Sequence, residues 1–276
     1  MNRRSFSICF LLWLIFIPSW GEAFVPEAPH LLYLVIEKIK RPSGFEVLQT
    51  RKIMTHGNVE NGWIEKQEKL FYLYPGRFRS EVVSDKITNF SVESESGFLK
   101  VSGGRALSTK KSPVDRYNDI LLYREIESLI RELLDAGIDS QKVSFKKYKG
   151  TICYVIGRPV MKGKPFASLW IEKETLFPVR YVVGKDGRFI EINYSDWEKV
   201  SRTWYPMRGS AYLDNQLIFT VDVKNVDLKS GFSPSLFDVA HLLKRYPEKE
   251  QGVSTDNNEQ GKEFDRRIVE FRKFYE

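Results

Sequence analysis

The chain has 276 residues, with 43 lysines and arginines against 36 aspartates and glutamates, and a formal net charge of +7 at pH 7. Because the basic residues are scattered rather than clustered, they do not form the stripe that nucleic-acid binding requires, and we expect no nucleic-acid partner. Hydrophobic residues make up 42% of the chain and aromatic residues 14%, which is enough to build one large domain or two small ones.

The first 23 residues have the three parts of a secretory signal peptide. Arg3 and Arg4 supply the charged region, residues 8–17 the apolar region, and Gly21-Glu22-Ala23 a small-x-small cleavage site. We therefore expect export and a periplasmic mature chain that begins near Phe24. An uncleaved inner-membrane anchor is the alternative, since the apolar run is close to the length at which the two become hard to separate.

The two cysteines give no disulfide to the chain that is expected to be exported. Cleavage removes Cys9 and leaves Cys153 alone, so no intramolecular disulfide is expected in the mature chain. Cys9 lies inside the apolar run rather than just after it behind a small residue, so no lipid anchor is expected. Stability must then come from a hydrophobic core.

The first third of the mature sequence predicts a helix followed by strands. Residues 31–40 have a wide apolar face between two prolines, which predicts a short helix. Residues 87–101 predict two weaker strands, and residues 102–114, with Gly103-Gly104 and mixed charge, predict a mobile loop. The clearest strands, the last two joined by a proline turn, are predicted at residues 45–55, 62–74 and 78–84.

Residues 118–136 are the strongest helix prediction in the sequence. Asn118 is a good N-cap, Gly137 is a stop, and between them leucines and isoleucines recur at spacings of four, three and four. Two more strands are predicted after this helix, at residues 143–145 and 151–158.

Residues 166–228 predict an antiparallel meander of five strands. In residues 188–197, Ile190, Ile192 and Tyr194 alternate with polar residues, and Phe219 and Val221 alternate in the same way further on. Strands this short need a second apolar layer on their dry face, which a sheet, a helix or a ligand could supply.

The C-terminal region predicts two further elements. Residues 233–245 predict a short helical piece, and residues 247–261 have the polar composition of a linker. A terminal helix is then predicted, which either docks on the body or meets a membrane partner. Its apolar stripe consists of Phe264, Ile268, Phe271 and Tyr275.

Catalytic patterns find little support in the sequence. The three histidines, His30, His56 and His241, lie in different predicted elements with no neighbouring cysteine, so no metal site is expected. Nucleophile-elbow, phosphate-loop and dinucleotide fingerprints are missing, and two Ser-x-x-Lys matches lack their companion motifs. We expect neither enzymatic activity nor a cofactor.

Four segments carry a resemblance to a known superfamily. Residues 69–81 (KLFYLYPGRFRSE), 168–183 (SLWIEKETLFPVRYVV), 191–206 and 235–238 (SLFD) resemble the LolA/LolB-type outer-membrane lipoprotein carriers, in a divergent branch. The resemblance implies an α+β fold, an open and incomplete antiparallel β-barrel of about 10–11 strands with helices covering its concave face. It divides the chain into a signal peptide (1–23), a lipid-binding half-barrel (24–245) and a polar linker with an amphipathic helix (246–276).

The function that this resemblance implies is transport. The protein would carry acyl chains of lipoproteins or lipids in a hydrophobic cavity towards the outer membrane, as a monomer. Its partners would be the acylated lipoprotein or lipid cargo, an inner-membrane ABC- or RND-type lipid exporter, and an outer-membrane acceptor. The alternative is an RseB-like periplasmic sensor, which uses the same fold to bind lipid or a regulatory protein.

The resemblance and the alternation together nominate site residues. In LolA-like carriers an arginine before the turn proline latches the helical lid. Here that position is Tyr74, so the sequence does not predict this arginine latch. The residues expected to line the lipid-binding cavity are Phe78, Val82, Ile190, Ile192, Tyr194, Phe219 and Val221. The residues expected on the lid are Leu31, Val35, Leu122, Ile126 and Leu129.

Overall fold

The computed structural model describes most of the expected mature chain. The expected signal peptide and residues 248–258 of the expected linker lie outside the described residues. The described ranges are 25–40, 42–54, 62–85, 88–161, 164–185, 188–229, 231–247 and 259–275.

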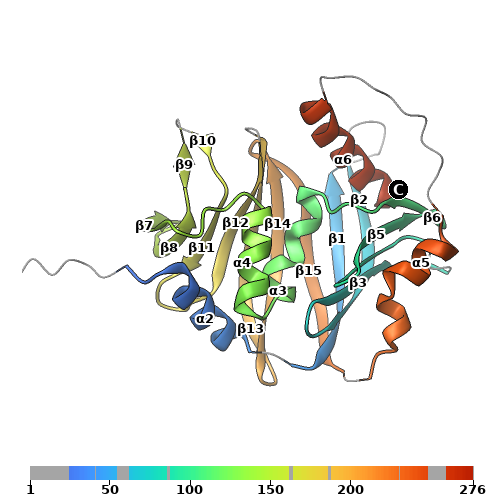
Figure 1. Ribbon diagram of the computed structural model, residues 1–276, viewed down its shortest axis with the longest axis horizontal. Helices are drawn as coiled ribbons and strands as arrows, with labels where there is room; N and C mark the ends of the chain where they lie inside the picture. Colours follow the sequence, from blue (N-terminus) through green and yellow to red (C-terminus); the bar gives the residue numbers. More distant parts are fainter. Residues whose placement is uncertain are drawn as a thin grey trace, which may run out of the picture.

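Thirteen antiparallel strands form a continuous sheet whose two ends do not meet (Figure 1). Neighbours in sequence are mostly neighbours in space, and the exception is central, because β1 pairs with β15 and so joins the first strand to the last. The sheet order is β6-β5-β4-β3-β2-β1-β15-β14-β13-β12-β11-β8-β7. The ranges in this sheet are β1 Gly44–Met54, β2 Trp63–Leu73, β3 Arg77–Val82, β4 Phe90–Ser94, β5 Gly97–Ser102, β6 Arg105–Ser108, β7 Val143–Tyr148, β8 Thr151–Gly157, β11 Ser168–Glu172, β12 Pro178–Lys185, β13 Arg188–Val200, β14 Thr203–Leu213 and β15 Gln216–Leu228. A separate ribbon consists of β9 (Val160–Met161) and β10 (Lys164–Pro165).

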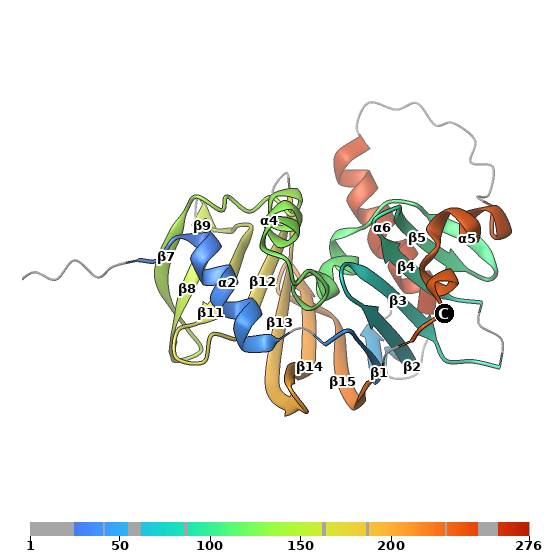
Figure 2. The same ribbon diagram turned by 60° about the horizontal axis from the view of Figure 1, so that its bottom comes forward.

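The helices lie on both faces of this sheet. In Figure 1, α3 and α4 lie over the strands β12 to β15, α2 lies beside them on the side of β11 and β13, and α6 lies over β1 and β2. Figure 2 shows the sheet curving around α2 and α4, and we call the face covered by α2, α3, α4 and α6 the concave face. The helical segments are α2 (Ala28–Ile39), the 3-10 helix η2 (Pro113–Asn118), α3 (Asp119–Leu122), α4 (Ile126–Asp135), the 3-10 helix η3 (Pro234–Phe237), α5 (Val239–Arg245) and α6 (Glu259–Tyr275).

The expected fold class is confirmed, and the number of strands is larger than expected. The five-strand meander is present as β11 to β15, but the region expected to be a mobile loop contains β6, which pairs with β5. Gly103 and Gly104 both have positive φ, at 56° and 74°, and so form the tight turn of a hairpin rather than a loose connection. The glycine pair, which predicts a mobile loop in the sequence, is the turn between β5 and β6 in the structure.

The long helix expected at residues 118–136 is broken in two. Tyr123 and Glu125 have extended backbones, which separate α3 from α4. The Tyr123 hydroxyl donates to a carboxylate oxygen of Glu93 on β4 at 2.5 Å, and buried Arg124 donates to the Leu121 carbonyl at 2.8 Å. These contacts favour a break that the spacing of the apolar residues does not show.

Two hydrophobic clusters stabilise opposite faces of the sheet. The main cluster lies between the concave face and the helices α2, α3, α4 and α6. The second lies on the other face of β4 and β5, where Phe90, Val92 and Leu99 pack against Phe237 of η3 and Leu242 of α5. The strands at this end therefore turn their apolar side chains away from the concave face.

Candidate functional site

Strand register places the expected cavity residues on the concave face. Ile192 lies opposite Ala211, which lies opposite Phe219, and the next row runs from Tyr194 through Gly209 to Val221. Residues directly opposite each other in a sheet share a face, so the meander residues point the same way. Phe78 and Val82 of β3 lie opposite concave-face residues of β2.

All seven of these side chains are buried in the main cluster, and none is more than 6% exposed. The structure brings them to one face but fills the space above them with helices. Tyr117 of η2 packs its ring 5.3 Å from that of Tyr194 and 6.0 Å from that of Phe219. Their role in binding acyl chains stays a prediction.

The expected lid residues supply part of this cover. Leu31 and Val35 of α2, Leu122 of α3 and Leu129 of α4 are buried against the sheet, and Ile126 is partly buried beside them. They lie where a lid would have to lie, between the helices and the meander. The opening of these helices as a lid stays a prediction.

Tyr74 makes a contact of the kind expected from the missing arginine. Its hydroxyl donates to the backbone carbonyl of Leu121 in α3 at 2.7 Å. Burial raises the pKa of Tyr74, so the hydroxyl stays a donor at neutral pH. Arg124 donates to the same carbonyl and lies over the Tyr74 ring. The hydrogen bonds to this backbone oxygen add to those that Tyr181 and Tyr194 make to the helical cover.

The other half of the concave face, formed by β1 to β5, carries buried polar side chains beside its apolar ones. Glu68 of β2 is fully buried and accepts hydrogen bonds from Gln49 at 2.6 Å and Arg51 at 2.8 Å, both on β1. Lys100 of β5 is also buried and pairs with Asp115 at the start of η2. This half therefore adds buried hydrogen-bonded and ion-paired side chains to apolar ones such as Phe78 and Val82.

Helix α6 covers this half. Phe271 lies 5.4 Å from the Phe219 ring, and the Arg51 guanidinium lies 4.5 Å from the Phe219 centroid and 5.5 Å from that of Tyr275. The Tyr275 hydroxyl donates to Glu68 at 2.5 Å. The expected stripe is thus the docking face of α6 at Ile268, Phe271 and Tyr275, while the side chain of Phe264 lies outside the described ones.

Three carboxylates meet beside α3, but cations already occupy the space between them. Oxygens of Glu93, Asp119 and Glu132 lie within 4.8 Å of one another. The Lys111 ammonium lies 2.6 Å from Glu93 and 2.5 Å from Asp119, and Arg116 lies 3.1 Å from Asp119. Burial acts to lower the pKa of Lys111, but these carboxylates raise it above 10.5, so the group is a buried ion network rather than a metal site.

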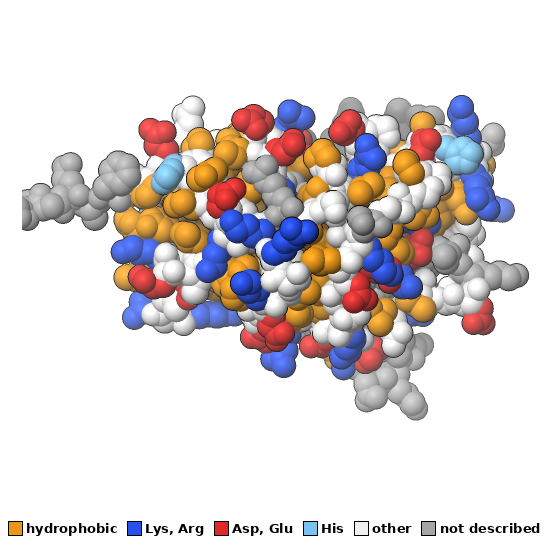
Figure 3. Space-filling view, turned by 90° about the horizontal axis from the view of Figure 1, so that it is seen from below, with side chains coloured by type: hydrophobic (Ala, Val, Ile, Leu, Met, Phe, Trp, Pro, Cys, Tyr) orange, Lys and Arg blue, Asp and Glu red, His pale blue; other side chains and the backbone are white. Residues whose placement is uncertain are grey.

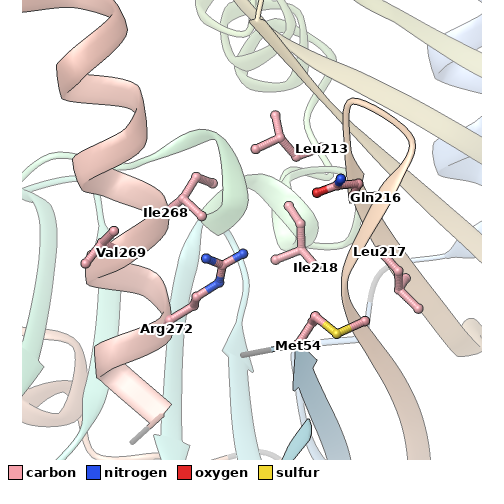
Figure 4. A pocket seen from close by; sticks show the side chains of 8 residues that line it. All are labelled: Met54, Leu213, Gln216, Leu217, Ile218, Ile268, Val269 and Arg272. Atoms are coloured by element: carbon pink, nitrogen blue, oxygen red, sulfur yellow. The ribbon is translucent and has the colours of Figure 1, made fainter. Parts of the chain in front are cut away.

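A pocket opens where α6 meets the β14–β15 hairpin and the end of β1 (Figure 4). Its volume is about 510 Å³, within the range of small-molecule sites. Ile218 and Ile268 belong to both the pocket wall and the main cluster, so the pocket continues the apolar interior. None of the seven expected cavity residues lines it. The lining residues are Met54, Leu213, Gln216, Leu217, Ile218, Ile268, Val269 and Arg272.

The surface is mixed in charge. Figure 3 shows lysine and arginine side chains interspersed with acidic and apolar ones over the face seen from below, as their scatter in the sequence indicates. Within the described ranges, none of the helices combines the length and the apolar character needed to cross a membrane.

Comparison with known proteins shows likeness at the level of fold. No protein-family model and no curated protein matches the sequence. Among solved structures, the chain is similar to a domain described as an outer membrane lipoprotein-sorting protein from Vibrio parahaemolyticus, with a TM-score of 0.57, 10% identity, and coverage of 78% of this chain and 97% of that one.

Two further structures give the same result. A LolA superfamily protein from Nitrosomonas europaea has a TM-score of 0.54 and 11% identity over 79% of this chain and all of that one. A DUF1329 family protein from Desulfovibrio piger has a TM-score of 0.51 and 17% identity over 78% and 98%. The resemblance found in the sequence is therefore confirmed for the fold, which is LolA-like.

Proposed function

We propose that the protein is a periplasmic carrier that binds acyl chains of a lipid or lipoprotein between the concave face and its helical cover. The observation that supports this most directly is the pocket beside α6, whose wall is mostly apolar and continues into the main cluster through Ile218 and Ile268. The LolA-like fold supports the same proposal. Binding of this kind requires shape and apolar area, and no catalytic group.

Magnitudes show that an acyl chain could exchange with part of the cover. Transfer of an acyl chain of about sixteen carbons from an apolar site to water costs on the order of 12 kcal/mol of free energy, at about 0.8 kcal/mol per CH₂. Four side chains of α6, Ile268, Phe271, Phe274 and Tyr275, are buried. At about 1.5–3 kcal/mol each, they contribute roughly 6–12 kcal/mol. The two quantities are of similar size, so the exchange requires little net free energy.

The remaining parts of the proposal concern the route. The predicted signal peptide would deliver the chain to the periplasm, where it would act as a monomer. An ABC- or RND-type exporter in the inner membrane would load it with an acylated lipoprotein or a lipid, and an outer-membrane acceptor would unload it. The direction of transport would come from these partners, since a passive cavity has no energy source of its own.

Native mass spectrometry with lipid extraction tests the proposal. The mature chain, prepared from a periplasmic fraction without detergent, should carry a discrete added mass or take up an offered diacylated peptide. Leu217→Asp should reduce this uptake at least tenfold, because Leu217 is a half-buried residue of the pocket wall and the change puts a charge there.

Ile152→Asp is the matched control for this test. Ile152 lies on β8, outside the pocket lining, and is 54% exposed, so the same type of change should leave uptake intact. A bare mass with no uptake of palmitate or diacylated peptide would contradict the carrier proposal.

A protein-binding module, like the RseB-type sensors, is the second candidate. It is favoured by the observation that the concave face already holds an amphipathic helix, α6, through Phe271 and Tyr275. For a protein-binding module, a synthetic peptide of residues 259–275 should bind in trans to a Phe271→Ser chain that takes up no lipid.

A further inference from the structure

Helix α6 is held on the concave face by side-chain packing and by a few hydrogen bonds. The sheet order contains no strand from this region, so α6 shares no backbone ladder with the sheet. Arg267 donates to the Ser108 hydroxyl at 2.5 Å, and Asn89 donates to the Phe274 carbonyl at 2.6 Å. Together with the Tyr275–Glu68 hydrogen bond, these contacts form a polar rim around the four buried apolar side chains.

The surface beneath α6 does not depend on α6 for its hydrogen bonds. Glu68 keeps Gln49 and Arg51 as partners when Tyr275 is taken away, and Lys100 keeps Asp115. A polar floor that is already paired can be exposed to water without leaving an unpaired buried charge. The apolar floor under α2 and α4 has no such property.

Helix α6 also covers one of the expected cavity residues. Phe271 packs against Phe219, and Ile268 forms part of the wall of the acyl-sized pocket. Any acyl chain that extends from the pocket along the concave face towards Phe219 meets α6 first. Cargo and α6 therefore compete for the same surface.

We propose that α6 is a built-in competitor of the cargo: it docks on the concave face of the empty protein and is displaced when an acyl chain extends from the pocket towards Phe219. This inference rests on the proposed carrier function and adds its regulation. Because the docked helix reduces the fraction of binding-competent molecules, weakening its docking raises the apparent affinity for the acyl chain. By linkage, acyl-chain binding must release α6 by the same factor.

Palmitate binding by the full mature chain, measured by titration calorimetry, provides the first half of the test. Phe271→Ser should bind palmitate about tenfold more tightly than the unmodified chain, because it removes an apolar contact of α6 and leaves the concave face intact. Tyr275→Phe removes only the hydroxyl that donates to Glu68 and should give a smaller gain, about threefold. Arg266→Ala is the control, since its side chain is 50% exposed, and it should change nothing.

Hydrogen exchange of the α6 backbone amides provides the second half. These amides should be protected in the empty protein and lose protection in saturating palmitate, with α2 and β13 unchanged. Tight palmitate binding with α6 still protected would overturn the inference and leave the carrier function standing. An unchanged affinity in a Phe271→Ser chain whose α6 has lost protection would overturn it too. Absence of palmitate binding in every variant would overturn both proposals.

Discussion

The two halves of the concave face are covered by helices in opposite ways. Under α2, α3 and α4 the floor is apolar, with Ile190 and Ile192 completely buried, whereas under α6 the apolar Phe219 lies beside Glu68 and Arg51, which are buried as a pair. An apolar floor cannot be uncovered without a large loss of free energy, but a paired polar floor can. Helices α2 to α4 therefore cover a larger apolar floor than α6, and α6 is the replaceable part of the cover.

Lys111 lies at the seam between the halves, and its replacement should have the largest effect. Lys111→Met leaves Glu93 and Asp119 buried without their central cation, which should reduce the free energy of unfolding by about 3–5 kcal/mol. Urea denaturation measures the loss. Lys147→Met, at an exposed position on β7, is the control. Equal free energies of unfolding for the two variants would show that Lys111 does not stabilise the fold.

A matched pair of isoleucines compares the two covers directly. Ile192→Ala in the apolar half should lower the free energy of unfolding by about 2–5 kcal/mol, because it opens a cavity in a permanent core. Ile268→Ala on α6 should lower it by less than about 1 kcal/mol, because α6 can undock before the body unfolds. Similar losses in chemical denaturation would mean that α6 is as integral as α2.

The Tyr74 latch should have a moderate effect. Tyr74→Phe removes the hydrogen bond to the Leu121 carbonyl, which Arg124 still satisfies, so the expected loss is about 0.5–1.5 kcal/mol. Exchange of the α3 and α4 amides should accelerate, while that of α6 should not. Tyr33→Phe is the control, because Tyr33 is 45% exposed. Faster exchange of the α6 amides in Tyr74→Phe would contradict a hydrogen bond that holds only α3 and α4.

The smallest effect concerns pH. Burial raises the pKa of Glu132 above 4.5, an effect that Lys111 opposes and Asp119 reinforces. The folded protein therefore holds this proton more tightly than the unfolded chain, and the resulting stability is complete below pH 4.5 and lost as pH rises through the raised pKa. Relative to Glu132→Gln, the unmodified chain should gain stability as pH falls from neutral to 4.5, and a relative loss would reverse the sign.

Alternation predicted the strands well because it reports a property of each strand alone. Ile190, Ile192 and Tyr194 do share a face, and β1, β2 and β3 begin and end close to their expected residues. The break at Tyr123 could not be predicted in this way, since its cause is Glu93, thirty residues earlier in the chain.

The buried polar side chains of the site were missed for a similar reason. Gln49, Arg51 and Glu68 occupy positions that face the interior, but polar residues in an alternating strand are normally assigned to solvent. In the fold they are covered by Tyr117 of η2 and by α6, which lies more than 180 residues after Glu68. The stripe of α6 was visible in the sequence, and its docking partner was not.

The pairing of β1 with β15 has a consequence for how the chain matures. Phe45 meets Leu228, so the central ladder of the sheet cannot form until nearly all of the strands have been synthesised. Contacts between such distant segments slow folding. A chain that cannot complete its central ladder early stays unfolded for longer.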